Sequence, residues 1–410
     1  MDIIADLQLH SRFSRACSKS IDLENLEKYA RIKGLNLLTT GDFQHPIWNK
    51  EIKKNLGEDE NGVLWSKTKF PFIWGTEISL MYSDNGRRAV HLLLFSPNGE
   101  VSDQIIDVLG RRGRLDYDGR PIFGMSCPEF VEIMKEVSEK TEIIPAHCMT
   151  SFFGVFGSKS GFDSLKDCFK DKVSKIHAIE SGMSADPSML WRLQEKVNIV
   201  SFSDAHSYWP FRLGREATVF DFDKLSYDNF ISTVRTGDGL KKTIEVFPEY
   251  GKYHIDGHRN CNFFCDYKES KKLNKICPKC NKELTIGVEY RIEELAKENK
   301  GYIPKDSKEF VKIIPLQELI AAVYDIKQLN SKKVLEIYNS LIKEFGNEFN
   351  VLLNADEEKL RKIVHEKLVK LILLNRNGEL KIKPGYDGVY GQISLDEKGK
   401  VKVQKSLGEF

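Results

Sequence analysis

The sequence predicts an α/β protein: a β/α barrel of seven strands, then a small cysteine-containing module and a C-terminal helical domain. Over about the first 250 residues, apolar runs of strand length alternate with segments of helical period, which is typical of β/α units around a parallel sheet. Near residue 256 the composition shifts to Lys, Asn and Cys, and helical periodicity dominates from residue 289 onward.

Length and charge limit the kinds of protein that this chain can be. At about 150 residues per domain, 410 residues predict two or three domains. The 62 basic and 60 acidic side chains leave a net charge of +2, so any contact with nucleic acid must come from local patches. We find neither an apolar run of the roughly 20 residues that a membrane span needs nor the basic-then-apolar order of a signal peptide. We therefore expect a cytoplasmic protein with no membrane partner.

The first β/α unit has residues that are typical of the start and the end of a helix. An apolar strand over residues 3–10 leads to a helix over 22–34, with Asp22 as N-cap and Gly34 as stop, and then to a strand over 35–38. Further strands are predicted over 70–74, 89–95, 142–144, 175–179 and 198–202. These seven strands place the barrel domain at residues 1–255.

Side chains that bind metals recur where these strands end. They are His10, Asp42, Glu77, His147, Asp204 and His206, while His91 lies early in its strand. In a β/α barrel the strands run the same way, so their C-terminal ends meet on one face. Imidazoles and carboxylates suit zinc, manganese or iron. A lone His is more often structural, but the joint pattern favours a metal site.

The four clustered cysteines predict a structural zinc site in a module over residues 256–300. Cys261-x3-Cys265 and Cys277-x2-Cys280 are two knuckles able to close a tetrahedron, and His258 is an alternative ligand. Seven Lys and Arg residues around the thiols outnumber the acidic ones, which indicates either phosphate contact or a solvated face.

The rest of the chain is predicted to be helical. Helices are expected over 289–300, 315–324, 332–345 and 356–374, which places a helical domain at 301–382. The tail over 383–410 has turn chemistry and short alternating runs, consistent with a hairpin.

Two loops of the barrel region carry side chains suited to DNA. Residues 110–114, with Arg120 nearby, present guanidinium groups that pair with phosphates. Residues 152–159 combine glycines with Phe152, Phe153 and Phe156, which either stack on bases or anchor the loop in the core. Tyr208, Trp209 and Phe211 carry the same ambiguity.

These motifs resemble the polymerase and histidinol phosphatase (PHP) family, a distorted seven-stranded β/α barrel with up to three metal ions. Asp6-Leu7-Gln8-Leu9-His10 resembles its opening motif, and Ser203-Asp204-Ala205-His206 resembles its closing Asp-x-His pair. Gln8 stands where that family usually has its first His, and Asp42 stands where a His is common.

The resemblance implies a specific set of metal ligands. It implies that Glu77 bridges two ions, that His10 and Asp204 hold one, that His91 and His147 hold another, and that Asp42 and His206 hold a third. Gln8 takes the place of a ligand, and His45 and Glu180 are weaker candidates outside the ligand shell. The barrel would then hold two or three divalent ions (Zn²⁺, Mn²⁺ or Mg²⁺), with Glu77, Asp204 and His206 in the chemistry.

Nearly the whole chain resembles the endonuclease Q family, most closely in residues 42–46, 179–187 and 204–217. The resemblance implies a metal-dependent nuclease that nicks double- or single-stranded DNA 5′ to deaminated bases (uracil, hypoxanthine, xanthine) or abasic sites. The helical domain would then bind DNA, and a sliding clamp or another repair protein is a candidate partner. Two alternatives stay open: a small-molecule phosphoesterase of the PHP superfamily, and a catalytically impaired DNA-binding protein in which Gln8 has disabled a metal site.

Overall fold

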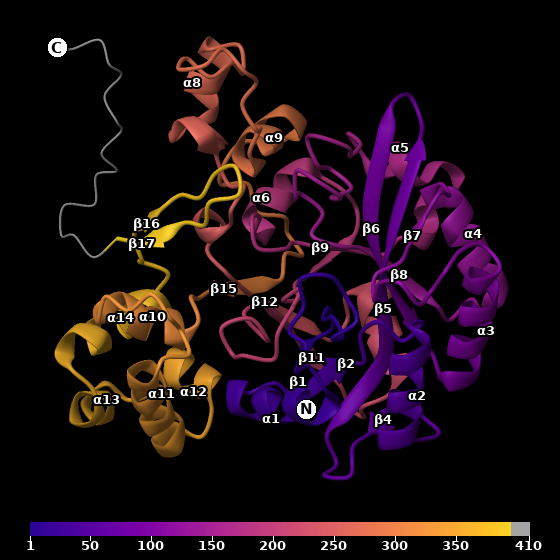
Figure 1. Ribbon diagram of the computed structural model, residues 1–410, viewed down its shortest axis with the longest axis horizontal. Coiled ribbons are helices and arrows are strands. Elements are labelled where there is room, and N and C mark those ends of the chain that lie inside the picture. Colours follow the sequence, from indigo (N-terminus) through magenta and orange to yellow (C-terminus); the bar gives the residue numbers. More distant parts are fainter. Residues whose placement is uncertain (395–410) are drawn as a thin grey trace.

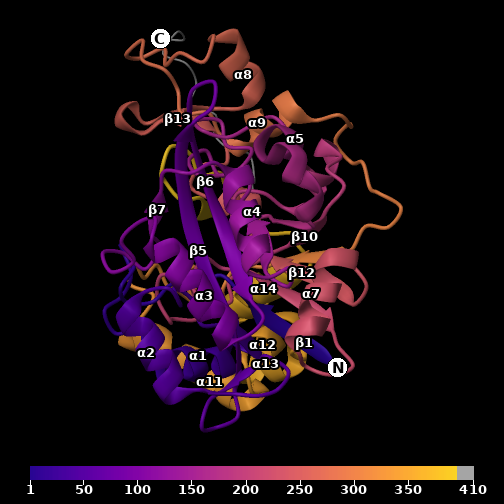
Figure 2. The same cartoon turned by 90° about the vertical axis from the view of Figure 1, so that its right-hand side faces the viewer.

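Seven strands form a closed circuit in the computed structural model, which describes residues 1–394 (Figures 1 and 2). They are β1 (Asp2–Asp6), β2 (Leu37–Thr39), β5 (Pro71–Ser83), β6 (Arg87–Ser96), β8 (Glu142–Pro145), β9 (Ala178–Glu180) and β10 (Asn198–Val200). Ladders join successive members except at two steps. Between β8 and β9, the Cys148 amide donates to the Glu180 carbonyl. Between β10 and β1, Leu9 and Ala205 form an isolated parallel β-bridge. The predicted seven-stranded barrel is confirmed.

Strand β6 runs against the other six, which corrects the expectation that all strands point the same way. It pairs antiparallel with both β5 and β8. Asn85 and Gly86, with φ of 49° and 123°, turn the chain from β5 directly into β6. Asn-Gly is a strong hairpin signal, and it explains the reversal of β6. Because β6 is reversed, its early residue His91 lies toward the mouth where the other strands end.

The barrel interior is a packed apolar core. Each of the seven strands contributes to one buried cluster, through Ala5, Leu37, Ile73, Leu93, Ile144, Ala178 and Val200. Short strands β4 (Leu64–Trp65) and β7 (Ile122–Phe123) pair with β5, and β3 (Gly57–Glu58) pairs with β4. Strands β11 (Ala217–Asp221), β12 (Leu240–Glu245) and β15 (Glu309–Lys312) continue the sheet beyond β1. Strand β15 lies in the predicted helical domain and pairs with β12 of the predicted barrel domain, so a sheet ladder joins these two parts of the chain.

Helices surround the barrel. Helix α1 (Leu23–Lys33) begins at Asp22, whose side chain accepts from the Asn25 amide, and ends at Gly34 with φ of 102°, as predicted. Helices α2 (Pro46–Asn55), α3 (Gly99–Gly110) and α4 (Cys127–Val137) lie along one side of the strands in Figure 1. The others are α5 (Leu165–Phe169), α6 (Pro187–Leu190) and α7 (Tyr227–Thr236).

The C-terminal helices follow the prediction with two differences. Helices α10 (Leu316–Val323) and α11 (Lys332–Phe345) match it, but α12 (Glu348–Leu353) was not foreseen. The helix expected over 356–374 is two, α13 (Glu357–Ile363) and α14 (Glu366–Arg376). The break falls at Val364, which is extended, and His365, which caps α14 by accepting from the Lys367 amide. The apolar period continues across the break and therefore hides it.

A buried ion pair joins these helices to the barrel. The fully buried Lys33 Nζ lies 2.7 Å from Glu348 Oε1 and donates to the Pro210 carbonyl at 2.7 Å. Glu348 also accepts from the Tyr338 hydroxyl at 2.8 Å. Because each charged atom is paired, this network fixes the position of the helices against α1.

The cysteine-containing module projects from one end of the molecule in Figure 1. It comprises β13 (Asp256–His258), β14 (Phe263–Cys265), α8 (Tyr267–Lys272) and α9 (Val288–Leu295), which is shorter than predicted. Strands β16 (Ile382–Lys383) and β17 (Gln392–Ile393) pair antiparallel at the start of the tail, and residues 395–410 of the expected hairpin region lie outside the described residues. Among residues 1–394, no helix is long and apolar enough to cross a membrane.

Candidate active site

Three predicted site residues share a rare backbone conformation. Asp42, His147 and Asp204 follow β2, β8 and β10 and have φ of 41°, 32° and 49°. This left-handed region costs about 1–3 kcal/mol for a residue with a side chain and persists only where the surrounding structure holds it. The neighbouring Gly182 leaves room for this turn, since a Cβ there would lie 2.6 Å from His147 Cβ. The fold thus turns these residues inward at one mouth of the barrel.

Glu77 on β5 lies at the centre of this mouth. Its Oε1 is 2.6 Å from His91 Nδ1 and 3.3 Å from His147 Nε2. Its Oε2 is 2.9 Å from His10 Nε2 and 3.3 Å from Arg120 Nη1. One buried carboxylate therefore touches donor atoms from four separate segments of the chain.

A second group of donors adjoins the first. His10 Nε2 lies 3.2 Å from Asp204 Oδ1, and His206 Nδ1 lies 3.6 Å from the same oxygen. The rings of His10 and His206 meet edge to face, with centroids 4.8 Å apart. Since His10 also contacts Glu77, the group of His10, Asp204 and His206 is continuous with the group of Glu77, His91 and His147.

Both groups fit divalent cations. In the Glu77 group, His91 Nδ1 and His147 Nε2 face each other at 3.2 Å beside the same carboxylate oxygen. One donor atom from each of three residues converges within 4.8 Å in either group. Imidazole nitrogen and carboxylate oxygen are the ligands of catalytic zinc and of manganese, so the donor chemistry matches the expected ions.

Asp42 lies behind His10 rather than in either group of donors. Its Oδ1 is 3.0 Å from His10 Nδ1, on the side of the ring away from Glu77. Its Oδ2 accepts from the Ser11 amide at 2.6 Å and from the hydroxyls of Ser11 and Ser14. Both oxygens are occupied by protein donors, and Asp42 belongs to neither group of three.

Gln8 also lies outside both groups. With its amide nitrogen turned toward Glu180, Gln8 donates to the two carboxylate oxygens at 2.6 and 2.7 Å. Glu180 in turn accepts from the His147 amide, and burial raises its pKa well above the usual value. His45 stacks on Phe13 with ring centroids 4.2 Å apart and contributes to neither group. Gln8 therefore holds Glu180, which in turn binds the backbone of His147.

The charges of the site suit cation binding. Burial opposes ionisation of Glu77, but Arg120 and His91 outweigh it and hold its pKa well below the usual value. Burial would raise the pKa of Asp204 as well, yet His206 and His10 lower it. Burial lowers the pKa of His91 to about 4, which keeps that imidazole neutral with a lone pair available at pH 7.

A cavity of about 470 Å³ opens beside the two groups. It is lined on the metal-binding side by His91, His147, Asp204 and His206, and elsewhere by Arg120, Phe152, Arg212, Arg215, Glu216, Lys252, Tyr253 and Tyr390, among others. Sequence reasoning placed Arg120 in a basic loop, and its contact with Glu77 has no local sequence signal. The cavity combines cationic and aromatic side chains next to the donor groups.

The three phenylalanines of the loop after His147 lie in different surroundings. Phe153 packs on the His91 ring with centroids 4.3 Å apart, and Phe156 is fully buried in the core. Phe152 is 44% exposed, lines the cavity and meets Tyr253 edge to face at 5.9 Å. Only Phe152 of the three is therefore free to contact a ligand in the cavity.

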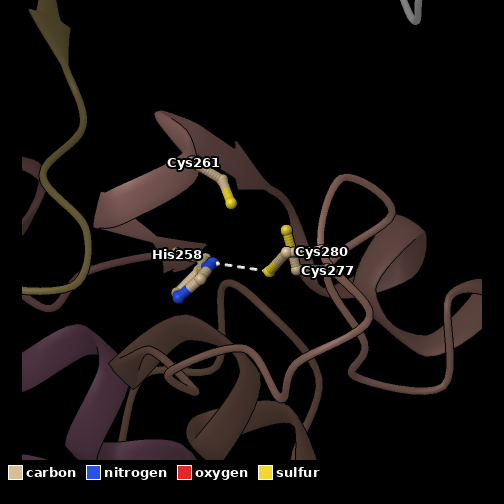
Figure 3. Close-up of side chains that lie close together, drawn as sticks. All are labelled: His258, Cys261, Cys277 and Cys280. Carbon is tan, nitrogen blue, oxygen red and sulfur yellow. Dashed lines mark hydrogen bonds between the residues drawn. The ribbon is translucent and has the colours of Figure 1, made fainter.

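In the module, one imidazole lies close to three of the four thiols. The convergent set is His258, Cys261, Cys277 and Cys280, with Cys280 Sγ 3.2 Å from His258 Nδ1 (Figure 3). The β13–β14 register pairs Cys265 with Asp256, two residues along the strand from His258, which is about 7 Å. Cys265 packs in a small core with Cys277 and Leu284, and Cys261 and Cys280 pack against the same core. The donor set, three thiols and one imidazole, fits tetrahedral zinc.

Solved structures similar to this chain cover nearly all of it. The lesion-specific endonuclease PfuEndoQ from Pyrococcus furiosus is 31% identical, with a TM-score of 0.85 over 98% of both chains. An endonuclease Q in complex with a 27-mer duplex, with an abasic lesion at its active site, is also 31% identical, with a TM-score of 0.87 over 98% of this chain and 99% of that one.

Sequence relatives extend the comparison. Uncharacterized protein MJ0043 of Methanocaldococcus jannaschii is 36% identical over 61% of this chain, and the match spans only 31% of that protein. Uncharacterized protein YqxK of Bacillus subtilis is 27% identical over 95% of this chain and 99% of its own length. The MJ0043 C-terminal domain family matches residues 315–379, which span α10 to α14. On the end-to-end match in sequence and structure, the chain belongs to the endonuclease Q family.

Proposed function

We propose that this protein is a metal-dependent DNA repair endonuclease that hydrolyses the phosphodiester 5′ to a deaminated base or an abasic site. The observation that carries the proposal is the pair of donor groups joined through Glu77 at the mouth of the barrel. It occurs in a chain that matches, over 98% of its length, a lesion-specific endonuclease and a complex with abasic duplex DNA.

Six side chains would hold the cations. We assign one site to His10, Asp204 and His206 and another to His91 and His147, with Glu77 shared between them. A divalent cation would supply a water of lowered pKa and neutralise charge on the phosphate. Neither Gln8 nor Asp42 enters these sites, so a glutamine at position 8 leaves both sets of donors complete. This argues against the impaired DNA-binding protein.

Other residues of the chain would bind and orient the strand. Arg120 contacts Glu77 and lines the cavity, and it would pair with the scissile phosphate. Reading one damaged base in a duplex requires turning it out of the stack, and the cavity of about 470 Å³ falls in the range of ligand pockets. Phe152 and Tyr253 offer aromatic faces there.

The module and helices would grip the duplex beside the barrel. Zinc held by His258, Cys261, Cys277 and Cys280 would stabilise the module, which carries Lys and Arg side chains suited to phosphates. A sliding clamp or another repair protein stays a proposed partner, tested by co-elution of the purified proteins in size-exclusion chromatography.

A nicking assay tests the proposal. Purified protein with Mn²⁺ or Mg²⁺ is incubated with duplexes that hold one uracil, hypoxanthine, xanthine or abasic site, and the cut is mapped to one nucleotide. We expect a nick on the 5′ side of the lesion that EDTA abolishes. Equal cutting of undamaged duplex, or hydrolysis of a small phosphate ester in place of DNA, would contradict the proposal.

Paired variants locate the chemistry. Asp204→Ala removes a donor from one group, and we expect it to lose nicking while DNA affinity, measured by fluorescence anisotropy, stays within a fewfold. The matched control is Asp228→Ala, at an exposed residue that pairs with Lys140 far from the mouth of the barrel. Similar activity in both variants would remove Asp204 from the mechanism.

A further inference from the structure

Arg215 is a buried guanidinium on the cavity wall with an unused donor. Its side chain is fixed because Nε donates to the Ser203 carbonyl at 2.9 Å, one residue before Asp204. Arg215 is 7% exposed, and its Nη1 has no hydrogen-bond partner among residues 1–394. A buried N–H without a partner costs about 1–3 kcal/mol, so an orphan donor beside a cavity points to a ligand acceptor.

The residue that follows adds a second buried polar atom to the same wall. Glu216 Oε1 accepts from the Val246 amide at 3.1 Å, while Oε2 has no partner among the described residues. Burial, reinforced by Glu245, raises the pKa of Glu216 well above its usual value. Since Oε1 already accepts a hydrogen bond, Oε2 is the atom of Glu216 that is left for a ligand in the cavity.

We propose that Arg215 is a specificity-determining residue that donates through Nη1 to the carbonyl oxygen that deamination introduces into a base. This inference rests on the proposed function, because it requires the lesion base to enter the cavity beside the metal-binding groups. Deamination replaces an exocyclic amine with a carbonyl: cytosine becomes uracil, adenine becomes hypoxanthine, and guanine becomes xanthine. In uracil and hypoxanthine the new acceptor stands at the corresponding place on the base, where cytosine and adenine have a donor; in xanthine it stands at C2, so Arg215 reads uracil and hypoxanthine.

A guanidinium suits this distinction because it has only donors. It pairs with the new carbonyl, whereas an amine at the same place would leave two donors facing each other and both unpaired. Thymine carries the same carbonyls as uracil, so Arg215 accounts for the rejection of cytosine and adenine, and the rejection of thymine depends on space for its methyl group.

A duplex with an abasic site has no lesion base for Arg215 to contact. It therefore distinguishes a contact of Arg215 with the base from contacts with the DNA backbone or with the protein. We would measure single-turnover nicking of duplexes with one uracil, one hypoxanthine or one abasic site, using wild type and Arg215→Met. Loss of a charged hydrogen bond predicts that the uracil and hypoxanthine rates fall roughly 10- to 100-fold further than the abasic rate. The matched control is Arg192→Met, at a buried arginine outside the cavity that pairs with Glu293 at 2.7 Å.

The outcomes are distinct. A selective fall for Arg215→Met, with Arg192→Met showing the wild-type ratio of uracil to abasic nicking, supports base reading. An equal fall on all three duplexes makes Arg215 a backbone contact or a support of Asp204 and overturns the inference. An unchanged ratio overturns it as well. If wild type nicks none of the duplexes, the proposed function itself fails, which is a different result from any of these.

Discussion

The substitution Asp42→Asn tests whether Asp42 orients His10 or binds a cation. Three donors converge on Asp42 Oδ2, namely the Ser11 amide and the hydroxyls of Ser11 and Ser14. In the variant they require the amide oxygen at that place, which leaves the amide NH₂ group facing His10 Nδ1 at about the 3.0 Å of the original pair. His10 Nδ1 must then accept, so its proton moves to Nε2, the nitrogen that faces Glu77 and Asp204.

The expected cost follows from that tautomer. A nitrogen that carries a proton has no lone pair for a cation, and loss of such an orienting carboxylate typically lowers metal affinity or activity 10- to 100-fold, or about 1.4–2.7 kcal/mol. We expect Asp42→Asn to need 10- to 100-fold more Mn²⁺ for half-maximal nicking. The number of metal ions bound per chain at saturation should equal that of wild type.

Metal analysis distinguishes the two roles. Mn²⁺ titrations of nicking give the affinity, and inductively coupled plasma mass spectrometry of saturated, desalted protein gives the stoichiometry. Loss of one ion per chain at saturation would make Asp42 a ligand, as its position after a strand first indicated, and would refute the orienting role. An unchanged Mn²⁺ dependence would refute both roles.

Three further predictions concern the rest of the molecule. Lys33→Met should lower the free energy of unfolding by about 3–5 kcal/mol, because it leaves the Glu348 carboxylate buried without its cation; adding Glu348→Leu should restore most of that loss in urea titrations. Burial raises the pKa of Glu245 to about 7, so the folded state binds its proton more tightly and loses stability as pH rises from about 4.5 to 7. Glu245→Gln should therefore gain about 1–3 kcal/mol relative to wild type between pH 5 and pH 8, and a constant difference would contradict the shifted pKa. Cys265→Ser should retain one zinc per chain while His258→Ala loses it, and the reverse result would restore the four-cysteine site.

The sequence predicted the barrel well because its signals are local. Asp22 and Gly34 frame a helix through side-chain and backbone preferences that act within one turn. All seven strand positions emerge from apolar runs. The direction of β6 follows from the hairpin turn at Asn85 and Gly86. The apolar pattern does not show this turn, so His91 did not fit the expectation that metal-binding residues follow the ends of strands.

The site was predicted as a set of residues but not as a geometry. Residue type and position at a strand end predicted that Glu77 and Asp42 lie at the same mouth of the barrel. The structure adds that Asp42 lies on the side of the His10 ring away from Glu77. Cysteine spacing marked the module, whereas the approach of His258 to three of the thiols depends on the register of two strands. Such distinctions arise from contacts between segments far apart in sequence, which no local pattern records.

The most direct test of the account is the combined nicking and metal content of Glu77→Gln, since Glu77 contacts His10 of one donor group and His91 of the other. On a duplex with one uracil, wild type should cut 5′ to the lesion and hold at least two barrel ions besides zinc. The variant should bind the duplex with near wild-type affinity, fail to cut it and hold fewer barrel ions. A variant that cuts at the wild-type rate with a full complement of ions would contradict a metal centre built around Glu77.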